Sequence, residues 1–240
     1  SPSFANVVLN TITADALNEI ADQLSDLKYR QDIRSKALEI CTDILRQHQR
    51  ILFSGDGYSE EWVEEARRRG LPNIPSFIES VSALISPKTI SLFTRNHIYT
   101  EKELLARSEI MSEQYVKITA IEAKVLIDMT KTEIIPLIVK EIRNLAETAA
   151  NLSKPAAYFA RQLDRLNEIL DRMDKMVTLL EEKDREIAGI SDTHERGIHF
   201  YHEVSPLMEQ LRQIIDEHET FCDKKQYSIP SYEDMLYHSH

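Results

Sequence analysis

An apolar stripe with a seven-residue repeat runs through the second half of the chain. Its members follow one another at alternating steps of four and three: Phe159, Leu163, Leu166, Leu170, Met173, Val177 and Leu180. This spacing places all seven side chains on one face of a long helix, as in the seam of a coiled coil. Burial stabilises each by about 1.5 to 3 kcal/mol, so the stripe contributes on the order of 10 kcal/mol and needs a partner.

The nearest candidate partner is a second apolar stripe that follows a break at residues 189–192. It consists of Ile198, Tyr201, Met208, Leu211, Ile215, His218 and Cys222. A short loop suffices to join two antiparallel helices. We therefore expect a long antiparallel, coiled-coil-like helical hairpin over about residues 155–222.

The rest of the chain is also predicted to be helical, because only 5 of its 240 residues are glycine and 8 are proline. Helical spacing marks helices over residues 12–27 and 33–45, with a break at 28–31. A capping box at Thr100–Glu103 starts a long helix that Pro136 should kink but not end. The seam expected on that helix is Leu104, Ser108, Met111, Tyr115, Ile118, Glu122, Val125 and Met129. The fold class is an all-α helical bundle.

Connectors divide the chain into two predicted parts. Two glycines mark a turn at residues 54–58, Ser59 can cap the short helix that ends at Gly70, and Pro72 and Pro75 require an irregular link. Residues 1–99 form a helical segment with Gly- and Pro-containing connectors. Residues 100–240 contain the kinked helix, the hairpin and a tail, 223–240, whose apolar content predicts docking.

Composition excludes several classes of protein. Forty acidic against 29 basic residues give a net charge of −11, which disfavours nucleic acid. No apolar run approaches the roughly 20 residues that span a bilayer, so no membrane partner is expected. The two cysteines, Cys41 and Cys222, lie far apart in the sequence, which fits a reducing cytoplasm. We expect both to behave as small buried apolar residues; a disulfide or a reactive thiol is the alternative.

No catalytic, cofactor or metal site is predicted. None of the eight histidines has the Glu three residues earlier that di-iron helical bundles use. Of His194, His199 and His202, only the last two share a helix face, and no cysteine joins them as a zinc ligand. The terminal pair His238 and His240 could bind metal adventitiously. No nucleophile elbow or phosphate-binding loop appears.

One turn could bind an anion. Gly55, Gly57 and Ser59 precede a helix whose first amides could face a negative ligand. Asp56, Glu60 and Glu61 crowd the same turn with negative charge, so a purely structural turn is the stronger interpretation.

Four segments together resemble the C-terminal part of a type III glutamine synthetase, over essentially the whole chain. They are residues 8–22; 55–62 (Gly-Asp-Gly-Tyr-Ser-Glu-Glu-Trp) with 69–72; 83–88 leading to the Glu101 helix; and 206–209 with 230–236. The segment from Gly55 to Trp62 is the most specific. Three positions depart from the pattern: Asn96-His97-Ile98 lacks an expected glycine, Ser108 replaces an aromatic residue and Tyr227 replaces a tryptophan.

The resemblance implies a structural and oligomerisation region of an enzyme that ligates ammonia to glutamate with ATP. Such enzymes bind ATP, Mg(II) or Mn(II) and substrates on a β-rich core, which would lie before Ser1 and against which residues 8–27 would pack. The resemblance also implies a homo-oligomer with a double hexameric ring. This chain alone would then be inactive, and an apolar flank near residues 1–17 should be exposed.

A rival hypothesis is a free-standing helical scaffold or adaptor that recruits a partner helix through the hairpin. It requires no enzyme core upstream. An independent metalloenzyme is a third possibility, which would retain stoichiometric metal after dialysis.

Overall fold

The structure is a computed structural model that describes residues 3–223, 227, 229, 230 and 232–237. Helices, turns and irregular links account for all of these residues, and no strand occurs among them. The chain separates into two compact units, residues 1–108 and 109–240. The boundary lies inside a helix that begins at Glu101, close to the division predicted after residue 99.

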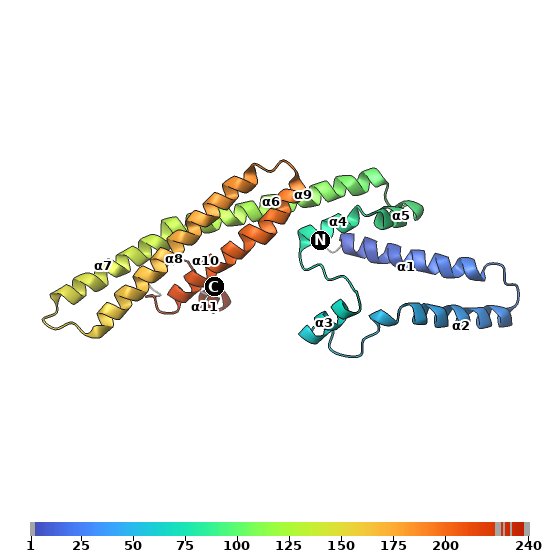
Figure 1. Cartoon of the computed structure of the whole chain (residues 1–240), viewed down its shortest axis with the longest axis horizontal. Coiled ribbons are helices and arrows are strands. Elements are labelled where there is room, and N and C mark those ends of the chain that lie inside the picture. Colours follow the sequence, from blue (N-terminus) through green and yellow to red (C-terminus); the bar gives the residue numbers. More distant parts are fainter. Residues whose placement is uncertain (1–2, 224–226, 228, 231, 238–240) are drawn as a thin grey trace. The chain divides into compact units, whose positions relative to one another are not determined.

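The first unit is built from short helices (Figure 1). They are α1 (Ser3–Leu24), α2 (Arg30–Gln47), the 3-10 turn η1 (Gln49–Ile51), α3 (Glu60–Arg68), α4 (Phe77–Leu84) and α5 (Pro87–Arg95). Serine side chains start three of them, because the hydroxyls of Ser59, Ser76 and Ser86 accept hydrogen bonds from first-turn amides. Gly70, with φ of 69°, ends α3 as predicted.

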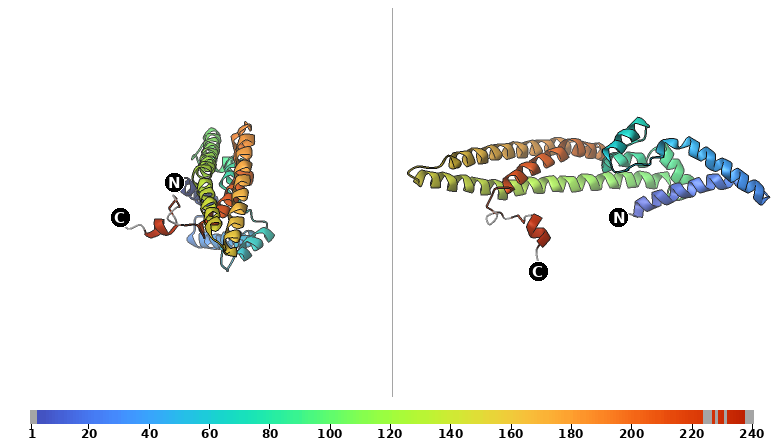
Figure 2. Two further views of the ribbon diagram at one scale, coloured as in Figure 1. Left: turned by 90° about the vertical axis from the view of Figure 1, so that its left-hand side faces the viewer. Right: turned by 90° about the horizontal axis from the view of Figure 1, so that it is seen from below.

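The second unit contains three long helical rods (Figure 2). One rod is α6 (Glu101–Met129), η2 (Thr130–Ile134) and α7 (Ile135–Asn151), and α8 (Ala157–Ala188) is the second. The third is α9 (Thr193–His199), η3 (Phe200–Val204) and α10 (Ser205–Glu219), after which comes the short helix α11 (Tyr232–Tyr237). Successive rods run in opposite directions (Figure 1).

Two rods pass through a proline without ending. A π-helical segment precedes each proline: η2 lies before Pro136 and η3 before Pro206. Since proline has no N–H and its ring displaces the preceding turn, the bonds shift by one residue. The amides of Ile135 and Ser205 therefore donate to the carbonyls of Thr130 and Phe200, five residues earlier. The prediction that Pro136 does not end its helix is confirmed, while the predicted kink stays a prediction.

The apolar stripe of α8 forms the centre of the second unit. Leu166, Met173, Val177 and Leu180 are buried, whereas Phe159, Leu163 and Leu170 are partly buried. Their expected partners Leu211 and Ile215 on α10 are buried as well, and Met208 is partly buried. The helix α8 packs not only on α10 but equally on α7. The hairpin is thus part of a three-rod bundle, and its coiled-coil geometry stays a prediction.

The seam predicted for α6 is wrong after its first turns. Ile118 and Val125 were expected inside, yet they are 47% and 50% exposed, and Glu122 is exposed too. The buried face instead carries small and polar residues as well as aliphatic ones: Leu104, Ser108, Ser112, Val116, Thr119, Ala123 and Ile127. These are separated by steps of four, four, four, three, four and four, a mean of about 3.8, so they drift away from the 3.5 repeat of the predicted seam.

The cysteines also differ from expectation. Cys41 on α2 is exposed rather than buried, while Cys222 is partly buried, and both are free thiols. The helix α2 packs against α1, and Cys41 lies on an exposed part of α2.

Candidate functional site

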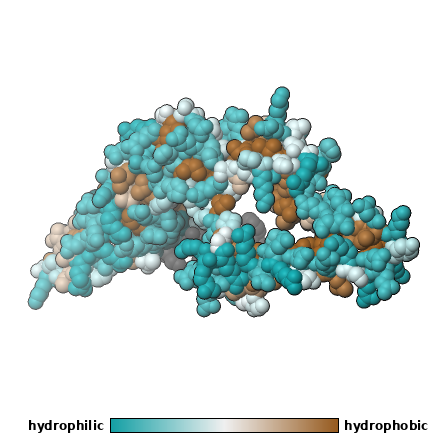
Figure 3. Space-filling view, turned by 45° about the vertical axis from the view of Figure 1, so that its right-hand side comes forward, coloured by the Kyte–Doolittle hydropathy of each residue, from teal (hydrophilic) through white to brown (hydrophobic). Residues whose placement is uncertain are grey.

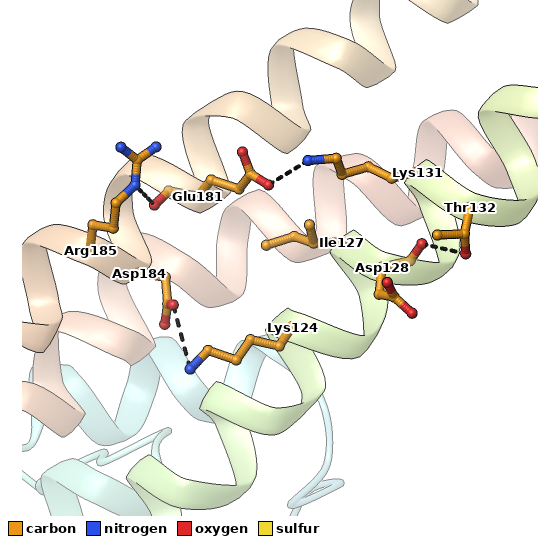
Figure 4. A pocket seen from close by; sticks show the side chains of 8 residues that line it. All are labelled: Lys124, Ile127, Asp128, Lys131, Thr132, Glu181, Asp184 and Arg185. Carbon is orange, nitrogen blue, oxygen red and sulfur yellow. Dashed lines mark hydrogen bonds and ion pairs between the residues drawn. The ribbon is translucent and has the colours of Figure 1, made fainter.

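A row of charged residues bridges α6 and α8 along an open groove of about 670 Å³ (Figure 4). The Nζ of Lys131 lies 2.8 Å from the Oε1 of Glu181, and the Nζ of Lys124 lies 3.8 Å from Asp184. The Nε of Arg185 donates to the carbonyl of Glu181 at 3.0 Å. Because each cation already has a partner within the bundle, this groove is an interhelical ion-pair row, of at most about 1 kcal/mol per exposed pair.

A second polar cluster fixes η3 to α8. Glu203 accepts from Lys183 at 2.9 Å and lies 2.5 Å from the Nδ1 of His199. The hydrogen bond from Lys183, followed by that from His199, lowers the pKa of Glu203, and the bonds to Glu186 and Glu203 raise the pKa of Lys183. His199, which was considered as a possible zinc ligand, therefore shares the carboxylate of Glu203 with Lys183.

The other two histidines of that group have different neighbours. His202 packs edge-on against Tyr201, and the Nδ1 of His194 lies 3.4 Å from the hydroxyl of Ser112. Within the described part of the chain, no three His, Cys, Asp or Glu side chains gather as a metal site. The possible adventitious pair, His238 and His240, lies outside the described residues.

A buried histidine joins α10 to α7. His218 has no exposed surface, and its Nε2 lies 2.8 Å from the Oε2 of Glu141. A buried polar ring is costly unless it is hydrogen-bonded, so this contact fixes the two helices in register. Sequence analysis placed His218 on the apolar stripe but missed Glu141, since nothing in the local pattern around that residue indicates a buried partner.

The turn considered as an anion site already uses its polar groups. The carboxylate of Asp56 accepts from the amide of Tyr58 at 2.9 Å, and the Oγ of Ser59 accepts from the amide of Trp62 at 3.3 Å. A side chain at Gly55 would collide with the ring of Phe53, while Gly57 faces open space. These contacts favour the structural interpretation; anion binding at Gly55, Gly57 and Ser59 stays a prediction.

The same segment carries an aromatic and arginine cluster. The rings of Phe53 and Trp62 stack with centroids 4.4 Å apart, and the guanidinium of Arg69 lies 5.7 Å from the Trp62 ring. Arg69 also donates to the carbonyl of Leu52 at 2.7 Å and pairs with Glu65, whose pKa is lowered mainly by that hydrogen bond. The cluster fastens the loop after α2 onto α3, which explains why this segment has such a distinctive sequence.

Helix α1 is held by polar contacts on one side and is apolar on another. Asp15 pairs with Arg95 and accepts from the side-chain amide of Asn96 at 2.7 Å, which together lower its pKa to about 2. Three large side chains, Leu9, Ile12 and Leu17, remain 62%, 49% and 59% exposed. Apolar residues also reach the surface in Figure 3. The apolar flank expected near residues 1–17 is therefore present.

None of the helices that the structure describes has the length and apolar character needed to cross a membrane.

Comparison with known proteins gives a consistent result. The family described as "Glutamine synthetase C-terminal domain" matches residues 36–153. The type-3 glutamine synthetase of Dictyostelium discoideum is 32% identical over 98% of this chain, and a glutamine synthetase of Butyrivibrio fibrisolvens is 30% identical over 86%. A glutamine synthetase of Bacteroides fragilis is 28% identical over 97%.

This chain spans only about a third of the length of each relative: 33%, 30% and 33% of the three proteins respectively. The family match covers both the helices of the first unit from α2 onward and the rod α6–α7, and the relatives extend it to nearly the whole chain. The chain belongs to the glutamine synthetase C-terminal domain family, and it corresponds to the C-terminal third of a type-3 glutamine synthetase.

Proposed function

We propose that this chain is the structural and assembly region of a glutamine synthetase whose active site lies on a separate catalytic core. In that enzyme ATP phosphorylates the glutamate side chain and ammonia displaces the phosphate. The chain itself contributes no catalytic residue and is inactive alone. The main support for this proposal is that nearly all of the chain aligns with only one third of each relative.

The exposed flank of α1 supports a core as the partner. Leu9, Ile12 and Leu17 lie within three turns of one helix, and their outward exposure leaves apolar surface in water. Meanwhile Asp15, one turn from Ile12, is held by Arg95 and Asn96 within its own unit. A helix fixed by polar contacts that leaves large apolar side chains exposed is suited to pack against the core.

The remaining assignments follow from the same proposal. ATP and Mg(II) or Mn(II) would bind to the core, where carboxylates and metal ions offset phosphate charge. The enzyme would work in the cytoplasm as a homo-oligomer with a double hexameric ring, and this region would pack against the core and neighbouring subunits.

The scaffold hypothesis finds less support in the structure. It needs the stripe from Phe159 to Leu180 to be available for a partner helix. That stripe is occupied inside the bundle, because α7 and α10 both pack on α8 and its central residues Met173 and Leu180 have no exposed surface.

A substitution on α1 tests the proposed partner. In the whole enzyme, replacing Leu9, Ile12 and Leu17 by Glu places three charges in the proposed interface, each of which would lose its hydration there. We expect glutamine formation to fall at least tenfold, since each 1.4 kcal/mol of lost docking energy is a factor of ten. The isolated chain should keep its helix content by circular dichroism, because these positions are exposed in it.

The matched control is Asn18→Glu, which adds a charge at an exposed polar position on the side of the helix away from Leu9 and should leave activity near normal. Full activity of the triple variant would show that this flank does not face the core.

A further inference from the structure

A groove between α6 and α10 is open along one half of its length. It is a hollow of about 530 Å³ lined by Tyr115, Thr119, Glu122 and Leu126 of α6 and by Ser205, Met208, Glu209 and Arg212 of α10. The apolar side chains Leu126 and Met208 pack against the core with one side and remain partly exposed on the other. The carboxylates of Glu122 and Glu209 are exposed at the rim.

The other half of the same groove is covered by the chain's own tail. Tyr227, Ile229 and Pro230 lie beside residues of α6, η2 and α10, among them Ile134 and Ile215, around a small cavity of about 240 Å³. Leu126 and Arg212 line both this cavity and the open hollow, so the two are continuous.

Described residues of the tail are anchored in the covered half. The ring of Tyr227 lies 6.2 Å from that of His218, and Ile229 packs against the hydrophobic core. Burial raises the pKa of Tyr227 to about 12, in keeping with a hydroxyl removed from water. Tyr227 and Ile229 thus contact the bundle, while docking of the tail as a whole stays a prediction.

The tail leads toward the open half. Helix α10 ends at Glu219, and the tail contacts Ile215 and Arg212, so the chain has turned back along α10 in the direction of Met208. Helix α11 comes next, and its Leu236 and Tyr237 are 76% and 78% exposed. Met235 of α11 lines the cavity of the covered half, which is continuous with the open hollow, so α11 lies beside the groove while two of its large side chains remain in water.

We propose that the open half of the α6–α10 groove is the seat of α11, so that the chain's own C-terminal helix completes the bundle as a strap. Leu236 would enter beside Leu126 and Met208, and the hydroxyl of Tyr237 would donate to a rim carboxylate, Glu122 or Glu209. The open half extends along α6 from Leu126 to Thr119, seven residues or about 10 Å, and a six-residue helix about 9 Å long fits that length. This inference stands apart from the proposed enzymatic role.

A disulfide test uses the whole chain. Cys41 and Cys222 are first replaced by Ser and Ala, and Met208→Cys is then combined with Leu236→Cys. Under mild oxidation we expect an intrachain disulfide, detected by gel mobility without reductant and by mass spectrometry of the linked peptides. A second pair, Glu209→Cys with Tyr237→Cys, uses an exposed rim position, so that it does not depend on how the groove floor tolerates substitution.

Two controls make the result decisive. Lys175→Cys on the exposed face of α8, combined with Leu236→Cys, should form several-fold less disulfide. Tyr227→Ala removes the anchor and should lower the yield of the groove pair. Equal yields from the groove and α8 pairs would overturn the proposal, as would predominantly interchain disulfides, which would assign the groove to a second copy.

Discussion

His97 is the only residue other than glycine with a positive φ, 55°, in the described part of the chain. The family resemblance predicts a glycine within Asn96-His97-Ile98, and the backbone gives the reason. A residue with a Cβ in the left-handed conformation is strained by about 1–2 kcal/mol. The side chain of His97 is exposed, so little packing would be lost on its removal.

His97→Gly should therefore stabilise the chain. The relieved strain exceeds the extra chain entropy of glycine, about 0.5–1 kcal/mol, which leaves a net gain of roughly 0.5–1 kcal/mol. Urea unfolding measures this change. His97→Ala keeps the Cβ and should give no such gain, and an equal gain from both variants would refute the backbone explanation.

Asp15 gives the first unit a dependence on acid pH. Hydrogen bonds from Arg95 and Asn96 lower its folded pKa to about 2, whereas an unfolded aspartate titrates near 3.9. A lowered pKa stabilises the fold above the unfolded value, and this contribution is lost as pH falls from about 4 to about 2.

We expect hydrogen exchange in α1 to accelerate over that pH interval, beyond the intrinsic pH effect on the amides. Asp15→Asn should exchange faster already at neutral pH and lose the acid-dependent step. An unchanged pH profile in the variant would mean that another group controls α1.

At the scale of the helix, α6 shows where the sequence misleads. Its outward residues Ile118, Ile121 and Val125 are more apolar than the Ser112 and Thr119 that the bundle buries, so a search for apolar spacing selects the wrong face. Small side chains such as Ala123 let neighbouring helices approach closely, a property that hydrophobicity does not record. The regular stripe of α8 has no such competing face, and its role as a packing seam stays a prediction.

The buried face of α6 can be checked by enlarging one residue on it and one residue outside it. Ala123 is 1% exposed, so Ala123→Leu should overpack the interface and cost about 1–3 kcal/mol in unfolding free energy. Val125→Leu, half a turn away and 50% exposed, should change it by less than about 0.5 kcal/mol. Similar losses of unfolding free energy in both variants, measured by thermal or urea unfolding, would support the seam first predicted for α6.

The two π-helical segments lie beyond what spacing alone can predict. Pro136 and Pro206 indicate that a regular α-helix is interrupted. Whether the helix ends, kinks or gains a residue depends on what packs around it. Here Thr130 and Val204 are fully buried within the segments, and Lys131 and Glu203 pair with α8 on either side. Tertiary contacts thus keep each rod continuous.

For the whole molecule, the helical class could be predicted from the sequence because it depends on strong local periodicity, whereas the seam between α8 and α10 stays a prediction. Sequence analysis missed the joint role of α7, the pair of His218 with Glu141 and the exposure of Cys41, since these depend on contacts distant in sequence. The candidate functional surface was foreseen only through family resemblance: Leu9, Ile12 and Leu17 look like ordinary helix residues until the structure leaves them exposed.

The most direct test of the central claim is ATP- and ammonia-dependent glutamine formation, measured for this chain alone and for the whole protein that contains it with its core. The account predicts no activity from the chain at any concentration of ATP, glutamate and Mg(II) or Mn(II), and turnover from the whole protein. Glutamine formed by the chain alone, or none formed by a folded whole protein with an intact core, would contradict it.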